Sequence, residues 1–363
     1  MAPTPSWQPT SVLVTGGAGF VGSHLCLRIR REFPHAKVVA MDNLFRRGSE
    51  LNLPRLAEAG VGFHRGDIRD PAAFPSGPFE LVLECSAEPS VLAGLSGDSP
   101  DYLMETNLMG TYRCLEHARV WGSRVIFFST SRVYPIAPLE RHPWTEDANR
   151  FRWLALPGSP IGPEGVQEAL AHHPESARSL YGFTKFASEL LIEEYRSAFR
   201  MPALINRCSV LAGPWQMGKV DQGVVALWVL RHHFKKPLRY IGYGGSGKQV
   251  RDVLHIDDLA DLVVSQIQNF SAWEGWRGNI GGGLAISASL VELTDLCRQV
   301  TGNTVPIAAD LSPRPADLRI FLADCALART QHDWTPTRSL EQIVADTHAW
   351  VRKHEKDLGP LVS

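Results

Sequence analysis

Short apolar runs alternate with longer helical patterns along the first half of the chain. The runs predict strands at residues 11–15, 37–41, 61–64, 79–85, 124–129 and 203–207. Between them, apolar positions recur at the spacing of amphipathic helices, notably at 21–33, 101–122 and 181–199. This order predicts a doubly wound α/β fold, in which crossover helices cover both faces of a parallel sheet.

A glycine-rich turn, TGGAGFVGSH, follows the first predicted strand directly. Gly16, Gly19 and Gly22 are spaced G-x-x-G-x-x-G, and Phe20 and Val21 stand where the next helix starts. Glycines let the chain pass close to a pyrophosphate, and the free N–H groups of a helix N-terminus attract that anion. The stretch therefore predicts a dinucleotide-binding site.

Asp42 is the residue expected to select the dinucleotide. It stands at the end of the second strand, twenty residues beyond Gly22. Its carboxylate can accept both hydroxyls of an adenosine ribose and repels a 2′-phosphate, so NAD is predicted rather than NADP. Asp67, after the third strand, is placed to meet the adenine amino group. Arg46 and its neighbour Arg47 are interpreted as a solvated loop pair.

Several motifs together resemble the extended short-chain dehydrogenase/reductase family, which acts mostly on nucleotide-sugars. The resemblance covers nearly the whole chain and rests on the glycine turn, GDI at 66–68, NLMGTY at 107–112, STSRVY at 129–134 and YGFTK at 181–185. It implies that Asn43, Ile68, Ala87 and Asn107 also bind the cofactor. The expected fold is a Rossmann-type sheet with a smaller C-terminal substrate-binding lobe.

The resemblance implies a catalytic role for Tyr181 and Lys185. Without it, this pair could be ordinary residues of an amphipathic helix. Tyr181 is expected to act as general base on a sugar hydroxyl while hydride passes to the nicotinamide. Lys185, one turn on, and the nicotinamide charge are expected to lower the pKa of that tyrosine, and both residues contact the cofactor. Thr130 is expected to bond the reacting oxygen; Ser131, also a substrate contact, is the alternative.

Two downstream segments match the nucleotide-sugar segments of the same family. They are GKQVRDVLHIDD at 247–258 and RPADLRIFLAD at 314–324. The match implies that Arg251 and Arg314 bind the diphosphate, a task that suits planar guanidinium groups. It also implies that Asp317 contacts the nucleotide ribose and that Gln222 contacts the substrate.

The substrate is predicted from a single stretch of the sequence, and alternatives to it stay open. The stretch VDQGVVALWVL at 220–230 is most similar to epimerases acting at C2 of a CDP-dideoxyhexose. A 4-epimerase of UDP-glucose or UDP-glucuronate type stays open, followed by a dehydratase or decarboxylase, and by a non-catalytic NAD-binding sensor. Eliminating relatives carry an acid after the catalytic hydroxyl, where this chain has Ser131 and Arg132. A guanidinium serves as neither acid nor base near neutrality, so epimerisation with a tightly bound, recycled NAD is predicted.

The apolar pattern loosens after residue 207, which predicts a division of the chain. An NAD-binding Rossmann domain is expected over 1–205, completed by 238–275, with a nucleotide-sugar-binding lobe from 206–237 and 276–363. The proline-rich connection at 135–178 is unusually long, and such loops are more often functional than idle.

The composition of the chain disfavours several classes of binding partner and of cellular location. The chain has 363 residues, a net charge of −1 and no basic cluster, which disfavours nucleic acid and anionic membranes. Six cysteines without a CxxC pair indicate reduced thiols in the cytoplasm, and adjacent histidines without a third ligand favour no metal. No secretory pattern or membrane-spanning run is present. The helices near 101–121 and 181–199 are apolar on more than one face, which predicts a homodimer.

Overall fold

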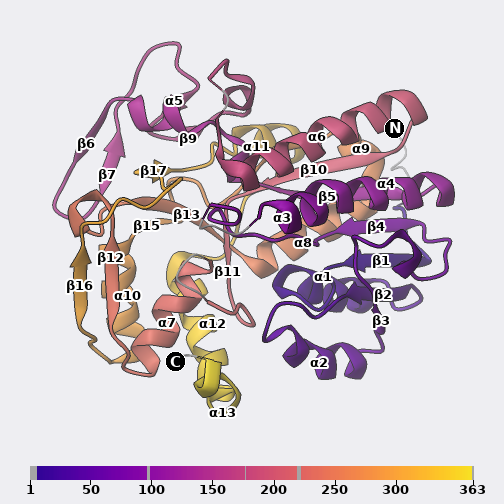
Figure 1. Ribbon diagram of the computed structural model, residues 1–363, viewed down its shortest axis with the longest axis horizontal. Coiled ribbons are helices and arrows are strands. Elements are labelled where there is room, and N and C mark those ends of the chain that lie inside the picture. The colour runs from indigo at the N-terminus through magenta and orange to yellow at the C-terminus, as the bar shows by residue number, and fades with distance from the viewer. Residues whose placement is uncertain (1–5, 96–98, 176, 219–221, 362–363) are drawn as a thin grey trace.

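The computed structural model describes residues 6–95, 99–175, 177–218 and 222–361, and its centre is a seven-stranded sheet (Figure 1). Every pairing in the sheet is parallel, in the order β14-β10-β5-β4-β1-β2-β3. The strands are β1 (Ser11–Thr15), β2 (Lys37–Asp42), β3 (Gly62–Arg65), β4 (Leu81–Glu84), β5 (Arg124–Thr130), β10 (Ala203–Cys208) and β14 (Arg277–Ile280). The predicted doubly wound α/β fold is confirmed.

Helices cover both faces of this sheet because its strands are apolar on both sides. Val12 and Val14 pack with α1 (Phe20–Glu32) and α8 (Ile256–Gln268). Leu13, which points to the opposite face, packs with α4 (Gly110–Trp121) and α6 (Ser179–Phe199). Successive side chains of a strand face opposite ways, so one apolar run serves two cores.

The C-terminal lobe has its own small sheets and helices, at the left of Figure 1. Its strands are β11 (Val210–Ala212), β13 (Val250–His255), β15 (Ser287–Ser289) and β17 (Ile320–Phe321) in one sheet, and β12 (Leu238–Ile241) with β16 (Ile307–Asp310) in another. The helices α7 (Val224–His233), α10 (Leu290–Thr301) and α12 (Leu340–Lys353) pack on one another around a second core. Within the described ranges, no helix combines the length and hydrophobicity that crossing a bilayer requires.

The sheet does not follow the predicted division of the chain at its edge. Strand β14 pairs with β10, although residues 277–280 fall in the segment assigned to the lobe. Conversely, β12 and β13 lie in 238–275 but belong to other sheets, whereas α8 and α9 (Phe270–Trp273) of that segment pack on the central sheet. A four-residue strand between glycines carries too little pattern to be assigned from sequence.

The long connection at 135–178 is structured. It contains α5 (Ile136–Arg141) and two hairpins, β6 (Trp144–Glu146) with β7 (Phe151–Trp153) and β8 (Ile161–Gly162) with β9 (Gly165–Val166). Its apolar side chains form a core with β17, and a 2.5 Å ion pair joins Arg150 to Glu292 of α10. The connection is therefore anchored to the lobe. The remaining helices are the short α2 (Leu53–Glu58), α3 (Asp101–Met104), α9 (Phe270–Trp273), α11 (Ala326–His332) and α13 (Glu355–Leu358).

Candidate active site

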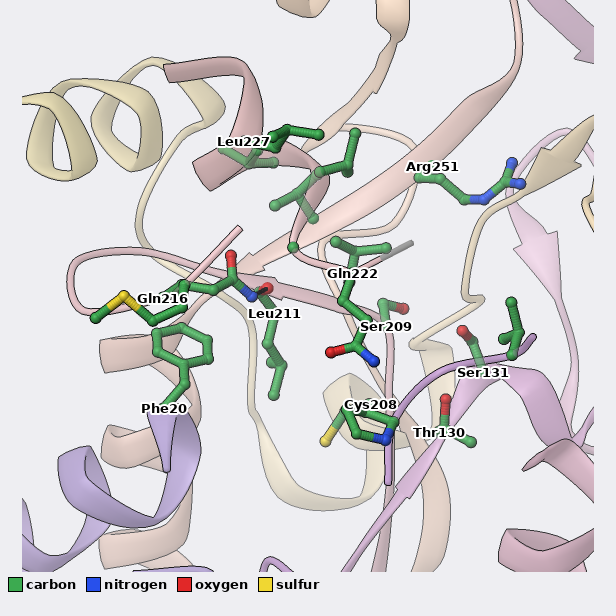
Figure 2. A pocket seen from close by; sticks show the side chains of 18 of the residues that line it. Phe20, Thr130, Ser131, Cys208, Ser209, Leu211, Gln216, Gln222, Leu227 and Arg251 are labelled. Atoms are coloured by element: carbon green, nitrogen blue, oxygen red, sulfur yellow. Dashed lines mark hydrogen bonds between the residues drawn. The ribbon is translucent and has the colours of Figure 1, made fainter. Parts of the chain in front are cut away.

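A cavity of about 710 Å³ lies where the central sheet meets the lobe. The glycine turn and the ends of β4, β5 and β10 line one side, and α7, β12, β13 and residues 314–317 line the other. In the view of Figure 2, Gln222 lies between Phe20 on the left and Thr130 with Ser131 on the right. The carboxyl ends of parallel strands meet here, which is where doubly wound folds bind ligands.

The glycine turn is built for close approach of the backbone. Gly16 has a φ of +61°, and a Cβ on it would lie 2.8 Å from the carbonyl oxygen of Cys85. A Cβ on Gly22 would collide with the carbonyl oxygen of Gly16. Helix α1 starts at Phe20 with Gly19 as N-cap and without a side-chain cap, so its first N–H groups are left for a ligand in the cavity. These residues fit a dinucleotide pyrophosphate.

Asp42 is the residue of the predicted cofactor site that is expected to bind the adenosine ribose. Its carboxylate accepts hydrogen bonds from the backbone N–H groups of Ala18, at 3.1 Å, and Leu44, at 2.8 Å. Burial raises the pKa of this carboxyl, and the backbone donors oppose that shift. Both oxygens keep a further lone pair, so the carboxylate is held beside the glycine turn with acceptor capacity for ribose hydroxyls.

Asp67 is engaged by protein partners. Arg69 binds its carboxylate at 2.8 Å and Asn43 donates to it at 3.0 Å. The hydrogen bonds from Arg69 are the main reason that the pKa of Asp67 lies well below its usual range. Ile68, also predicted to bind the cofactor, is buried against Gly110 in the core below the cavity.

Asn107 fixes the loop after β4 from within a π-helical turn, Glu105–Met109. Its side chain accepts from the N–H of Glu88 at 2.8 Å and donates to the carbonyl of Glu88 at 3.0 Å. This clamp sets the course of the chain at Ala87, which lines the cavity. π-Helical turns are frequent at functional sites. Asn107 thus shapes the predicted cofactor site through the backbone.

Thr130 and Tyr181 come together at the end of β5. Burial raises the pKa of Tyr181 to about 12, and its hydrogen bond with Thr130 and the charge of Arg132 act against burial. Ser129 points away and donates to Glu189 at 2.5 Å, which leaves Thr130 and Ser131 facing the cavity (Figure 2). The sequence predicts that Lys185 and the nicotinamide charge lower this pKa when NAD is bound, and the structure shows that burial acts in the opposite direction.

Lys185 has a partner that the sequence analysis missed. Its ammonium lies 3.7 Å from the carboxylate of Glu84, at the end of β4, and 3.9 Å from the centre of the Phe127 ring. Both charged side chains are almost fully buried. The available signal was an acidic residue that ends the apolar run LVLE. Arg132, and not Lys185, is the leading cation acting on Tyr181.

Positive charge gathers on the lobe side of the cavity. Arg251 donates to Asp317 at 2.7 Å, and Arg314 lines the cavity beside them. Arg132 donates to the carbonyl of Ala316 at 2.8 Å, and burial lowers its pKa to about 10, which leaves it charged near neutrality. The predicted diphosphate and ribose contacts are therefore neighbours in space. Arg132 extends the group toward Tyr181.

Gln222 joins the lobe to the cofactor side. Its amide donates to Glu88 at 3.2 Å and accepts from Arg46, which also donates to the carbonyl of Met217 at 2.9 Å. The interpretation of Arg46 as a solvated loop residue is wrong, because the folded lobe brings its partners to it. Of the stretch 220–230, Val220 and Asp221 lie outside the described residues.

Comparison with known proteins assigns this chain and its fold to one family. Residues 12–281 match the model of the NAD dependent epimerase/dehydratase family. CDP-paratose 2-epimerase of Salmonella typhi is 29% identical, over 93% of this chain and 98% of its own. UDP-glucose 4-epimerase of Erwinia amylovora is also 29% identical, over 94% and 97%. The structure of UDP-glucose 4-epimerase from Thermotoga maritima with UDP-glucose has a TM-score of 0.75 at 25% identity, covering 95% of this chain and 99% of that one. This chain therefore belongs to the NAD dependent epimerase/dehydratase family, and NAD is its cofactor.

Proposed function

We propose that this chain is a nucleotide-sugar epimerase that oxidises one sugar carbon transiently and restores it with the opposite configuration. The observation that carries the proposal is a single cavity that joins the glycine turn, the Thr130–Tyr181 pair and the arginines at 251 and 314. A dinucleotide on the glycine turn and a diphosphate on the arginines place a sugar between them, beside Tyr181.

The catalytic work falls to Tyr181 and Thr130. Tyr181 takes the proton of a sugar hydroxyl and later returns it, while Thr130 hydrogen-bonds the same oxygen. Bound NAD supplies the hydride acceptor and donor, and its oxidised ring adds a positive charge. With a pKa raised to about 12 by burial, Tyr181 needs such nearby positive charge to ionise, and Arg132 already supplies one.

The substrate that we propose is CDP-paratose, interconverted with CDP-tyvelose at C2. The similarity to the Salmonella typhi 2-epimerase supports this choice along nearly the full length of both chains. A UDP-sugar 4-epimerase is the second candidate, favoured by the equal identity of the Erwinia amylovora enzyme and by the similar fold of the Thermotoga maritima enzyme. In either case Arg251 and Arg314 bind the diphosphate and Asp317 contacts the nucleotide ribose.

A dehydratase or decarboxylase is disfavoured by the residues beside Thr130. Elimination of water needs one group to remove a carbon-bound proton and another to protonate the leaving oxygen. Ser131 and Arg132 stand where such groups would be, and a charged guanidinium can do neither near neutrality. We therefore expect hydride to return to the carbon that it left.

Two measurements test this function. The purified protein is denatured and its supernatant assayed for NAD, which should be present at close to one per chain. CDP-paratose is then followed by NMR in deuterated water, with UDP- and GDP-sugars in parallel. Conversion to CDP-tyvelose without deuterium in the sugar carbons supports the proposal. Deuterium at C5 or C6, or a 4-keto-6-deoxy product, would revive the dehydratase.

We also propose a homodimer and a cytoplasmic location. The outer faces of α4 and α6 expose apolar side chains, among them Tyr112, Val120, Phe183, Leu190 and Phe199, at 40–71% of their surface. Such a face on two neighbouring helices suits a two-fold partner that presents the same face. The cytoplasmic location rests on six free cysteines, which suit a reducing compartment.

A further inference from the structure

Glu84 is a buried acid beside Lys185, one of the residues expected to contact the cofactor. It ends β4, between Thr15 of β1 and Phe127 of β5 in the register of the sheet, and its side chain is 1% exposed. Lys185 and the backbone N–H of Ser86 are its donors, but neither contact has the geometry of an ordinary hydrogen bond. The ammonium of Lys185 lies 3.7 Å away, close enough to form an ion pair but too far for a direct hydrogen bond.

The charge of this pair changes near neutral pH. Burial raises the pKa of the Glu84 carboxyl to about 7, and the charge of Lys185 opposes that rise. The other titratable groups beside Glu84 and Lys185 include the thiols of Cys85, Cys114 and Cys208, which stay neutral because burial raises their pKa above the usual value. With Lys185 charged, the pair carries +1 when Glu84 is protonated and zero when it is ionised.

This charge lies at the wall of the cofactor cavity. Cys85, the residue after Glu84, and Lys185 both line the cavity, together with Gly16 and Tyr181. The family resemblance implies that Tyr181 and Lys185 both contact the cofactor, and the present inference rests on the proposed function with the nicotinamide in that place. The oxidised ring carries one positive charge that the reduced ring lacks. A neighbouring pair with a net charge of +1 disfavours the oxidised form relative to a neutral pair.

We propose that Glu84 biases the bound cofactor toward its oxidised form by neutralising Lys185. Glu84 is thus a positioning residue that acts through the lysine and touches neither sugar nor cofactor. The bias suits an enzyme that must regain NAD⁺ after each turnover, because it favours return of hydride to the sugar. It also makes the preference for NAD⁺ weaken as Glu84 takes up a proton.

The test measures which form of the cofactor the protein holds, without any sugar. Wild-type protein, Glu84→Gln and Glu84→Asp are dialysed against fixed mixtures of NAD⁺ and NADH at pH 6 and pH 8.5, then denatured to assay the bound ratio. In the wild type, the preference for NAD⁺ over NADH should rise about five- to twentyfold from pH 6 to pH 8.5. This is the effect of one charge at about 10 Å in a medium of effective dielectric constant about 20. Tyr181, whose pKa burial raises to about 12 before the cofactor binds, is present in the wild type and in every Glu84 variant, so the comparison between them isolates Glu84.

The variants separate charge from structure. Glu84→Gln should show a pH-independent ratio that matches the wild type at pH 6, and Glu84→Asp should recover the pH dependence. Glu58→Gln, an exposed position on α2, is the matched loss of one charge and should behave as wild type. Loss of packing weakens both forms of the cofactor and cancels in the ratio. An equal ratio in wild type and Glu84→Gln at pH 8.5 overturns the inference, whereas a wild type that binds neither form overturns the proposed function.

Discussion

Arg207 and Glu189 form a buried ion pair behind the catalytic strand end, and the two partners should differ when removed. Arg207 of β10 is 1% exposed and Glu189 of α6 is fully buried, with nitrogen–oxygen distances from 2.7 to 3.1 Å. Glu189 also holds Ser129, the residue before Thr130, at 2.5 Å. The pair therefore joins α6 to the sheet at the site.

Glu189→Gln leaves a guanidinium that cannot lose its proton, so it should lower the free energy of unfolding by about 3–5 kcal/mol at any pH from 5.5 to 7.5. Arg207→Met leaves a carboxylate that can instead take up a proton. Protonation of this carboxylate costs about 1.4 kcal/mol for each pH unit above an ordinary glutamate pKa of about 4.3. The cost is about 1.6 kcal/mol at pH 5.5 and about 4.4 kcal/mol at pH 7.5. The stability of Arg207→Met should thus fall by about 2.7 kcal/mol over this range relative to wild type.

Urea unfolding followed by tryptophan fluorescence measures both variants, each against wild type at the same pH, so that other titrating groups cancel. Arg196→Met removes a partly exposed ion pair on the same helix and is the control, with an expected cost below about 1 kcal/mol. A cost for Arg207→Met that does not change with pH would refute the reasoning. So would a Glu189→Gln variant as stable as the control.

Three further predictions concern the site and the assembly. Tyr181→Phe should keep NAD affinity but lower turnover about 10²- to 10⁴-fold, and a variant that turns over like wild type would exclude Tyr181 as the base. Wild-type turnover should rise from pH 6 to 9 because burial raises the pKa of Tyr181. Gly22→Ala should abolish NAD binding because its Cβ collides with the carbonyl of Gly16, whereas Gly162→Ala, with open space around it, should leave NAD affinity unchanged. Sedimentation should give a dimer for wild type at micromolar concentration and a monomer for Val120→Glu with Leu190→Glu, and a wild-type monomer would count against the dimer.

Local signals in the sequence determined the nucleotide end of this protein. Each strand from β1 to β5, and β10, lies within two residues of its predicted bounds. For all but the exposed edge strand β3 this follows because a buried parallel strand must be a continuous apolar run. The glycine turn and Asp42 could be assigned for a similar reason. The function of the glycine turn depends on its backbone conformation, and that of Asp42 depends on its place at the end of a strand. Nearby residues in the sequence predict both features.

Tertiary structure decided which charges meet. Arg46 and Gln222 are 176 positions apart, and no local pattern reveals that the lobe carries one to the other. Glu84, at the end of β4, and Lys185, on α6, come together only because α6 packs on the sheet over β5, the neighbour of β4. The pKa of Tyr181 likewise depends on how deeply its ring is buried and on Arg132 beside it, and neither effect can be predicted from the sequence. Burial and pairing are properties of the packed chain, and they set the electrostatics on which the chemistry depends.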